Sequence, residues 1–416
     1  MHLNRRNFLK GLGSTIALSA LPNIQNFAYQ PLLSNNPNEE ILVFVFLRGG
    51  CDALNFIAPM GNRHYADARI KELRVPENAN FTLKNGLDGL DFNIHPKAAA
   101  LKELYDSQDL AVVHATGLTN GTRSHFEAMN LIEQGLTKNQ GNAVGWMTRY
   151  FETISHKGEL PAVAIGGNGL PTSFLGCQQA ASIDDLADFN VIGEPIMQEV
   201  LREFYNGNTF LDQTGQQTLA TLQHIQKKLK KNSKGEALDY HPAHDVDYPT
   251  EWYIKSFSQS LKNLARLIKM DVGTHLAMVE YDGWDHHENQ AFRFPQHLAG
   301  FSNALAAFYN DLSNYHQRMT IVVMSEFGRR LKSNRSGGTD HGHGGLALVL
   351  GGNVKGGKMY GQWPGLATHE LDKNVDLAVS TDYRTILGEV LSKRLQSKKL
   401  DFIFPNFDHH QALGFL

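Results

Sequence analysis

The sequence predicts an α/β fold in which a doubly wound, mainly parallel sheet is flanked by helices. Short apolar runs rich in β-branched residues alternate along the chain with amphipathic helical patterns, and this alternation is typical of parallel strands joined by crossover helices. Acidic, imidazole and hydroxyl side chains directly follow several of these runs, as they do where the carboxyl ends of parallel strands meet. The chain of 416 residues, 42% hydrophobic and 19% charged, is long enough for a large core.

The first thirty residues predict a targeting segment rather than part of the fold. Arg5 and Arg6 precede an apolar run at 11–21, which is the pattern of a twin-arginine signal. The run is about half as long as the ~20 residues that a spanning helix needs, so we expect no transmembrane segment. We therefore expect residues 1–30 to meet the twin-arginine export machinery, and the protein to be periplasmic or otherwise exported. This route carries folded proteins, often already loaded with a cofactor, which favours a bound metal.

The rest of the chain, 31–416, is predicted to form a single α/β domain. Apolar runs of four to seven residues predict strands at 41–47, 110–115, 162–165, 275–279, 320–324 and 346–350. Apolar residues at spacings of three and four predict helices at 64–73, 96–107, 125–134, 146–154, 195–206, 214–231, 251–270, 290–315 and 380–395. The stretch from about 190 to 270 has helical patterns and no strand signal, so it predicts a helical insertion or cap on the sheet.

Charge and cysteine content exclude two classes of protein. The 39 basic and 42 acidic side chains give a net charge of -3, and no basic run is interleaved with aromatic residues, so nucleic acid is not an expected partner. Cys51 and Cys177 are the two cysteines, and they form no Cys-x-x-Cys motif. We therefore expect the core, rather than disulfides, to supply most of the stability.

Asp52 follows the first predicted strand, behind Gly49 and Gly50. The glycines permit a sharp turn that brings a carboxylate from the strand end toward a metal. The alternative is an aspartate that only caps the turn.

Two acid and imidazole pairs follow the predicted strand at 275–279. Asp285 with His287, or Asp282 with His286, would each offer one carboxylate and one imidazole to the same ion. Two histidines and two aspartates within six residues favour metal binding over a solvated loop, but the spacing does not decide which pair binds.

The segment after the strand at 320–324 is the densest in ligand side chains. Glu326 stands at the strand end, and a glycine-rich loop then brings Asp340, His341 and His343. Carboxylate and imidazole ligands suit zinc first, with manganese, magnesium or calcium as alternatives, in a site of one or two ions. The absence of a cysteine ligand motif argues against a structural zinc.

Ser124 precedes the predicted helix at 125–134 and has two interpretations. It is an N-cap, or it is a nucleophile placed where free N–H groups and the helix dipole favour an oxyanion. The flanking Arg123 and His125 strengthen the catalytic interpretation. Arg329 and Arg330 are candidates to hold an anionic substrate, although a surface salt bridge is the commoner role of an arginine.

These motifs together resemble one family. The segments that carry the resemblance are 47–55, 123–126, 283–287, 325–329, 338–344 and 351–357. They resemble the bacterial family of unknown function DUF1501, whose members are similar to the alkaline phosphatase and sulfatase superfamily. That similarity implies an alkaline phosphatase-like fold with two metals, commonly zinc, held by Asp and His residues at strand ends. It also implies a Ser, Thr or formylglycine nucleophile at a helix start.

The resemblance assigns roles by position. It implies the following set: Asp52 as the ligand after the first strand, Ser124 as nucleophile, Asp285 and His287 as ligands of one metal, Glu326 as the acid after the later strand, and His341 or His343 as the last imidazole. In the superfamily an Asp-His pair follows the later strand, whereas this sequence has Glu326-Phe327 at that position. The loss of an imidazole there argues against a second metal. Neither cysteine lies in the context for formylglycine formation, which disfavours a conventional sulfatase mechanism.

The expected function is therefore an exported, metal-dependent hydrolase of phosphate or sulfate esters. Its substrate would be an anionic ester of a small molecule or glycan, and its cofactor one or two divalent ions. The alternative is a non-catalytic exported binding or assembly protein that retains the fold and holds at most one metal.

Overall fold

The computed structural model describes residues 39–416 except 142–143, 156–157, 167–168, 190, 192–195, 234–236 and 409–410. The predicted signal segment, 1–30, lies outside the described residues. Among the helices that are described, none has the length and apolar character needed to cross a membrane.

The predicted strands and helices are present with shifts at their ends, except that the helix predicted at 64–73 is broken at Arg69, where the backbone becomes extended. The strands are β1 Ile41–Leu47, β2 Ile57–Pro59, β3 Thr82–Leu83, β4 Phe92–Ile94, β5 Leu110–Gly117, β6 Ala162–Ile165, β7 Ala180–Ile183, β8 Leu276–Tyr281, β9 Met319–Ser325, β10 Arg329–Ser333, β11 Thr339–His341, β12 Gly345–Gly351, β13 Lys358–Tyr360 and β14 Thr381–Asp382. The helices are α2 Ala53–Phe56, α3 Arg63–Ala68, α4 Ala99–Asp106, α5 His125–Glu133, α6 Trp146–Glu152, α7 Ile196–Phe204, α8 Phe210–Lys228, α9 Lys255–Lys269, α10 Gln290–Asp311, α11 Tyr383–Lys393 and α12 Leu400–Ile403.

The central sheet has nine strands in the order β13-β5-β12-β9-β1-β8-β6-β7, with β14 beside β5. β1 is parallel to both β8 and β9, so Leu47 lies opposite Tyr281 on one side and Ser325 on the other. β12 is antiparallel to both of its neighbours, β5 and β9. The predicted mainly parallel α/β fold is confirmed.

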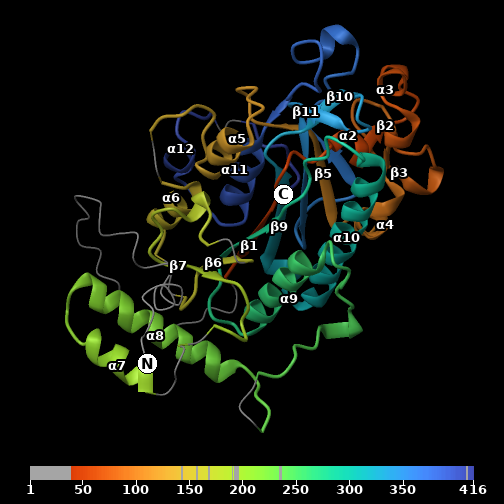
Figure 1. Ribbon diagram of the computed structural model, residues 1–416. Helices are drawn as coiled ribbons and strands as arrows, with labels where there is room; N and C mark the ends of the chain where they lie inside the picture. Colours follow the sequence, from red (N-terminus) through yellow and green to blue (C-terminus); the bar gives the residue numbers. More distant parts are fainter. Residues whose placement is uncertain are drawn as a thin grey trace.

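Helices cover both faces of this sheet (Figure 1). Alternate residues of β1 enter two different cores, with Val43 and Val45 on one face and Phe44 and Phe46 on the other. This two-sided burial explains why the strand reads as a continuous apolar run. Apolar side chains of α4, α9 and α10 fill the first core, and those of α5, α6 and α11 fill the second.

The predicted helical stretch at about 190–270 divides into two parts. α7 and α8 lie to one side of the sheet and share a small apolar cluster of Leu201, Tyr205 and Leu219 (Figure 1). α9 instead packs on the sheet itself, through residues such as Leu261 and Leu264. Thus α9 belongs to the helical layer, while α7 and α8 extend beyond it.

Most of the candidate site residues lie at one edge of the sheet. The carboxyl ends of β1, β5, β8 and β9 lie there, and because β12 runs the other way, its amino end lies there too. The hairpin of β10 and β11, which precedes β12, sits on the same edge, at the top of Figure 1. Segments more than 200 residues apart in sequence therefore meet at this edge.

Candidate metal centre

Four side chains from three segments converge at this edge. His125 is the first residue of α5, Asp285 and His287 follow β8, and His341 ends β11. Ligand atoms of His125, Asp285 and His341 all lie within 4.8 Å of one another, and within the described part of the chain no other group of this kind is found.

The ring atom Nε2 of His341 lies at the middle of the cluster. It is 3.0 Å from Nε2 of His125 and 2.9 Å from Nε2 of His287. Oδ1 of Asp285 is 3.1 Å from Nε2 of His341 and 3.0 Å from Nε2 of His287, and its Oδ2 is 3.5 Å from Nε2 of His125. Nε2 of His341 thus lies beside two other imidazole nitrogens and one carboxylate, and ligand atoms of His125, Asp285 and His341 form the compact part of the cluster.

The outer nitrogen of each ring faces an oxygen that accepts hydrogen bonds. Nδ1 of His125 lies 2.6 Å from Oε1 of Glu326, which is fully buried. Nδ1 of His341 lies 2.8 Å from the carbonyl oxygen of Arg123, and Nδ1 of His287 lies 3.4 Å from Oδ1 of Asp340. A neutral imidazole carries one proton, so these partners place it on Nδ1 and leave a lone pair on each Nε2.

This arrangement fits a bound cation. Three lone pairs and a carboxylate gathered around Nε2 of His341 repel one another unless a positive charge lies among them. Ligands about 2.0–2.1 Å from a tetrahedral zinc are about 3.3 Å apart, close to the contacts of 2.9 to 3.5 Å in the cluster. Imidazoles whose other nitrogen is held by a carboxylate or carbonyl are the usual form of metal-binding histidine.

The electrostatic surroundings keep two of the four groups in their ligand forms. Burial lowers the pKa of His341, and the nearby Arg329 and His125 lower it further, whereas the Arg123 carbonyl and Asp285 raise it. Burial raises the pKa of Asp285, but the hydrogen bond and charge of Arg329 outweigh it, so this pKa lies below its ordinary value. A neutral imidazole and an ionised carboxylate are the forms that bind metals.

Arg329, predicted to bind substrate, is buried and its donors are occupied. Its guanidinium donates to the carbonyl oxygens of Gly50 at 2.7 Å, Thr339 at 2.9 Å and Gly49, and it pairs with Asp285. Only 1% of its side chain is exposed. The arginine therefore orients the Asp285 carboxylate, and its contacts leave no free edge for an anionic substrate.

Asp52, predicted as a ligand, is not brought to the cluster. Its carboxylate is held by both terminal nitrogens of Arg69, at 2.6 and 2.8 Å, and by Nε2 of Gln290 at 2.6 Å. Oδ1 also accepts hydrogen bonds from the backbone N–H groups of Leu54 and Asn55, which makes Asp52 the N-cap of α2. Burial raises its pKa, yet the Arg69 charge and hydrogen bonds hold the pKa below its ordinary value. The capping alternative describes its geometry.

The two pairs that follow β8 are separated by the structure. His286 is buried, and its ring packs against Trp284, Phe294 and His297. Burial lowers its pKa to about 3. Because Asp285 and His287 are in contact and half exposed while His286 points into an aromatic cluster, the geometry favours the Asp285 and His287 pair.

His343 and Asp340 lie at different distances from the centre. The ring of His343 is buried, with Nε2 donating to the carbonyl oxygen of Leu118 at 2.6 Å and Nδ1 at 3.2 Å from Asp372. It therefore faces away from the four converging ligands. Asp340 touches the centre only through His287, and its pKa is lowered by hydrogen bonds from Asn334 and His287 that outweigh burial.

Ser124 is the N-cap of α5 and is exposed. Its Oγ accepts from the N–H of Glu127 at a long 3.5 Å, so the hydroxyl is only weakly engaged. As the residue before His125, it stands at the rim of the cluster.

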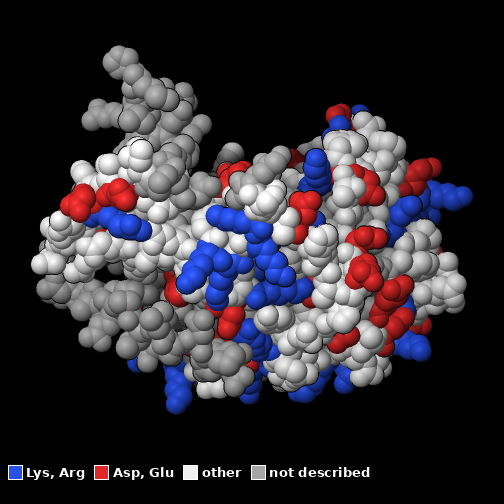
Figure 2. Space-filling model, turned by 90° about the horizontal axis from the view of Figure 1, so that it is seen from below, with Lys and Arg blue, Asp and Glu red and all other residues white. Residues whose placement is uncertain are grey.

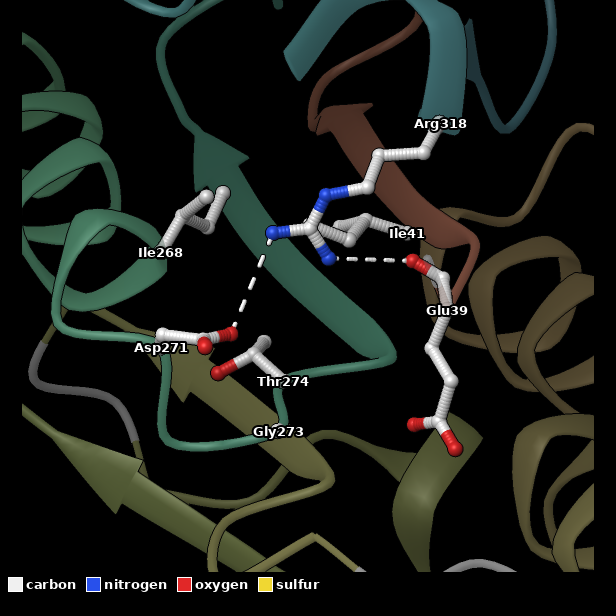
Figure 3. A pocket seen from close by; sticks show the side chains of 7 residues that line it. All are labelled: Glu39, Ile41, Ile268, Asp271, Gly273, Thr274 and Arg318. Atoms are coloured by element: carbon white, nitrogen blue, oxygen red, sulfur yellow. Dashed lines mark hydrogen bonds and ion pairs between the residues drawn. The ribbon is translucent and has the colours of Figure 1, made fainter. Parts of the chain in front are cut away.

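The centre is open to solvent. The side chains of Asp285 and His287 are 44% and 43% exposed. A small cavity lies at the other edge of the sheet, where the Arg318 guanidinium donates to the carbonyl oxygen of Glu39 at 3.1 Å and lies 3.9 Å from Asp271 (Figure 3). The face opposite the β10–β11 hairpin gathers lysines and arginines in its middle (Figure 2). Neither feature adjoins the cluster.

Sequence reasoning missed three roles. The ring of His125, a candidate catalytic residue, lies among the candidate ligands, and its position at a helix start after a strand is the signal that could have indicated this. Glu326 was assigned as a ligand, but its Oε1 faces His125 and its Oε2 accepts from Oγ of Ser325 at 2.9 Å. Arg69, the partner of Asp52, carried no recognisable signal.

Comparison with known proteins gives one family match. The model of the family described as "Protein of unknown function (DUF1501)" matches residues 39–397. No curated protein matches.

Several solved structures are similar at low identity. A protein in the alkaline phosphatase superfamily from Vibrio parahaemolyticus is 11% identical with a TM-score of 0.34, and the match covers 77% of this chain but only 62% of that protein. The C-terminal periplasmic domain of EcEptC from Escherichia coli in complex with Zn is 9% identical with a TM-score of 0.33, covering 76% and 73% of the two chains. Alkaline phosphatase from the Antarctic bacterium TAB5 is 10% identical with a TM-score of 0.34, covering 87% and 100%. TM-scores of this size do not support an argument about function.

Proposed function

The chain belongs to the DUF1501 family, and we propose that it is an exported, metal-dependent hydrolase of phosphate or sulfate esters. Its centre would hold one divalent ion, with zinc as the first candidate and manganese, magnesium or calcium as alternatives, between His125, Asp285, His287 and His341. The observation that carries the proposal is the convergence of three imidazole Nε2 atoms and one carboxylate, each ring with its outer nitrogen facing an acceptor.

A catalytic ion fits this site better than a structural one. Structural zinc sites are closed and commonly use cysteine, whereas catalytic sites keep one side open. Here the ligands are imidazole and carboxylate, and two of them are nearly half exposed. A bound divalent ion would act as a Lewis acid and lower the pKa of a coordinated water to about 7.

The residues around the ion would orient its ligands and supply the nucleophile. Arg329 holds the Asp285 carboxylate, and Glu326 holds the His125 ring, so both ligands are oriented before substrate arrives. The weakly engaged Ser124 hydroxyl at the start of α5 is the proposed nucleophile, and an attacking water is the alternative. The anionic ester, of a small molecule or glycan, is proposed from the resemblance to the superfamily.

A second candidate is an exported binding or assembly protein with at most one metal. The observation that favours it is that two candidate arginines are engaged: Arg329, a candidate to hold substrate, is buried, and the side chain of Arg123, a candidate catalytic residue, pairs with Asp376. An esterase needs another cationic group to hold its substrate, whereas a binding protein does not.

Elemental analysis combined with an ester panel tests the proposal. We expect about one equivalent of a divalent metal in the full chain and turnover of an aryl phosphate, phosphodiester or sulfate, with turnover lost and metal affinity strongly lowered, but still measurable, in His341→Ala. The matched control is His369→Ala, since His369 is an exposed histidine on a different segment. Metal without turnover on any ester would favour the binding protein, and a chain without metal after reconstitution would reject the metal centre.

A further inference from the structure

Arg123 touches the candidate metal centre through its backbone and not through its side chain. Its carbonyl oxygen accepts the hydrogen bond from Nδ1 of His341 at 2.8 Å. Its guanidinium turns to the carboxylate of Asp376, where Nε donates to Oδ2 at 2.8 Å and Nη2 donates to the same oxygen. This residue therefore joins the ligand cluster to a second group of charged side chains.

The second group fastens the loop that carries Arg123. Asp376 has no exposed side-chain surface, and the Asp372 carboxylate lies 3.6 Å from Nη2 of Arg123. Nδ1 of His343 lies 3.2 Å from Asp372, and its Nε2 donates to the carbonyl oxygen of Leu118 at 2.6 Å. The loop before α5 is thus held at both Leu118 and Arg123.

The segment that carries Asp372 and Asp376 is held together by its own backbone hydrogen bonds. The N–H of Asp372 donates to the carbonyl of Asp376 at 2.9 Å, and the N–H of Asp376 donates back to the carbonyl of Asp372 at 3.1 Å. Next along the chain, the carbonyl of Leu377 accepts from the N–H of Gly344 at 2.7 Å. The segment that holds Arg123 is therefore also tied to the chain that follows His341.

The Arg123 carbonyl decides whether His341 can bind a metal. A carbonyl only accepts, so it favours the tautomer with the proton on Nδ1 and a lone pair on Nε2. If the carbonyl moved away, the ring would also populate the Nε2–H tautomer, which cannot bind through that nitrogen.

We propose that Asp376, acting through Arg123, is a positioning residue of the metal centre that holds the Arg123 carbonyl against Nδ1 of His341. This inference rests on the proposed function, because it requires that the cluster binds a metal. It gives Arg123 a positioning role, whereas the sequence indicated it as a candidate catalytic residue beside Ser124.

The test is the zinc affinity of the full chain, measured by competition with a chromophoric chelator. We expect Asp376→Asn to bind zinc roughly 10- to 100-fold more weakly, the usual effect of losing a group that orients a ligand. The matched control is Asp382→Asn, whose carboxylate holds Arg384 at 3.0 and 2.8 Å without involving a proposed ligand, and its affinity should stay within about twofold of wild type.

Two further measurements separate positioning from a general loss of structure. In the His341→Ala background, Asp376→Asn should weaken zinc binding by no more than about twofold, because the ring through which it acts is gone. In the metal-free protein, histidine nitrogen NMR should show His341 as the Nδ1–H tautomer in wild type and a rise of the Nε2–H tautomer in Asp376→Asn. If Asp376→Asn does not fold, Arg123→Lys, which keeps the charge but loses the two-nitrogen contact, should still bind zinc several-fold more weakly.

The outcomes distinguish this proposal from the one on which it rests. A wild-type chain that binds no divalent ion would reject both. A wild-type chain that binds zinc, with Asp376→Asn and Arg123→Lys both within twofold of it, would overturn only the positioning role. Equal weakening by Asp376→Asn with and without His341 would overturn it too.

Discussion

Two carboxylates at neighbouring strand ends have opposite surroundings. Asp52 follows β1, is 2% exposed, and gives its oxygens to Arg69 and Gln290. Asp285 follows β8, and its side chain is 44% exposed; its Oδ1 contacts Arg329, His287 and His341, and its Oδ2 lies 3.5 Å from His125. The difference teaches that a strand-end carboxylate becomes a candidate ligand where it keeps exposed surface and faces imidazole nitrogens, even when an arginine pairs with it, and not where side chains of the core occupy both of its oxygens.

This difference also bears on the number of ions. The Arg69 guanidinium is a permanent cation that grips both oxygens of Asp52, so that carboxylate needs no metal to be stable in the core. At the Asp285 cluster, Arg329 neutralises the carboxylate but leaves the three lone pairs unopposed. We therefore propose one ion, at the Asp285 cluster.

The largest expected effect is on stability and comes from Asp52→Asn. This change leaves the buried Arg69 charge uncompensated, and we expect the free energy of unfolding to fall by about 3–5 kcal/mol with metal content unchanged. Urea denaturation of the mutant and of Asp106→Asn compares the fully buried pair with the pair of Lys102 and the exposed Asp106, for which we expect less than about 1 kcal/mol. If Asp52→Asn lost the metal but kept its stability, Asp52 would be a metal ligand rather than a residue that stabilises the core.

The next effect is on metal binding and comes from Asp285→Asn. We expect zinc affinity to fall at least 100-fold, or about 2.7 kcal/mol, because a charged ligand is lost. The metal-free protein should be destabilised less than by Asp52→Asn, since water reaches this carboxylate and Arg329 keeps its carbonyl partners. Chelator competition and urea denaturation on the same samples measure both. Unchanged affinity would remove Asp285 from the ligand set.

A smaller effect is expected from Glu326→Gln, which keeps the shape of the group that faces His125. We expect zinc affinity to fall about 10-fold, or about 1.4 kcal/mol, because the neutral amide holds the ring less strongly. A loss of one whole equivalent of metal would instead identify Glu326 as a direct ligand. Titration calorimetry, which gives stoichiometry as well as affinity, distinguishes the two.

The smallest effect on stability is expected from Ser124→Ala. The capping bond to Glu127 is long, so the free energy of unfolding should fall by less than about 1 kcal/mol, and metal content should not change. Turnover of the best ester should fall at least 100-fold if Ser124 is the nucleophile, whereas Ser124→Thr, which keeps a hydroxyl, should retain part of it. Wild-type turnover in Ser124→Ala would assign the attack to water.

The sheet could be predicted from sequence because its strands are buried on both faces. The predicted strand at 41–47 coincides with β1, and that at 162–165 with β6. The short strands β13 and β14 carry too few residues to give a signal. The antiparallel direction of β12 is also invisible in its composition, although it is what brings His341 to the carboxyl edge.

The candidate site could be predicted in its outline but not in its pairings. Residue type and position at strand ends indicated Asp285, His287 and His341. Asp52 had the same signals, but its carboxylate pairs with Arg69 instead of joining the cluster. Arg69 lies where α3 ends and the backbone becomes extended, a break that the helical pattern at 64–73 did not predict. Spacing alone also cannot show that His343, two residues after His341, faces Asp372 instead of the cluster.

Arg329 has a consequence for the order of folding. Its guanidinium reaches carbonyls of Gly49 and Gly50 across 280 and 279 positions of sequence, and Asp285 across 44. Such distant contacts close late, because the loop between them must first be ordered. A chain able to hold the ion at Asp285 has therefore already joined its first strand to its last third. Only molecules in which these distant segments have already come together would then bind the metal.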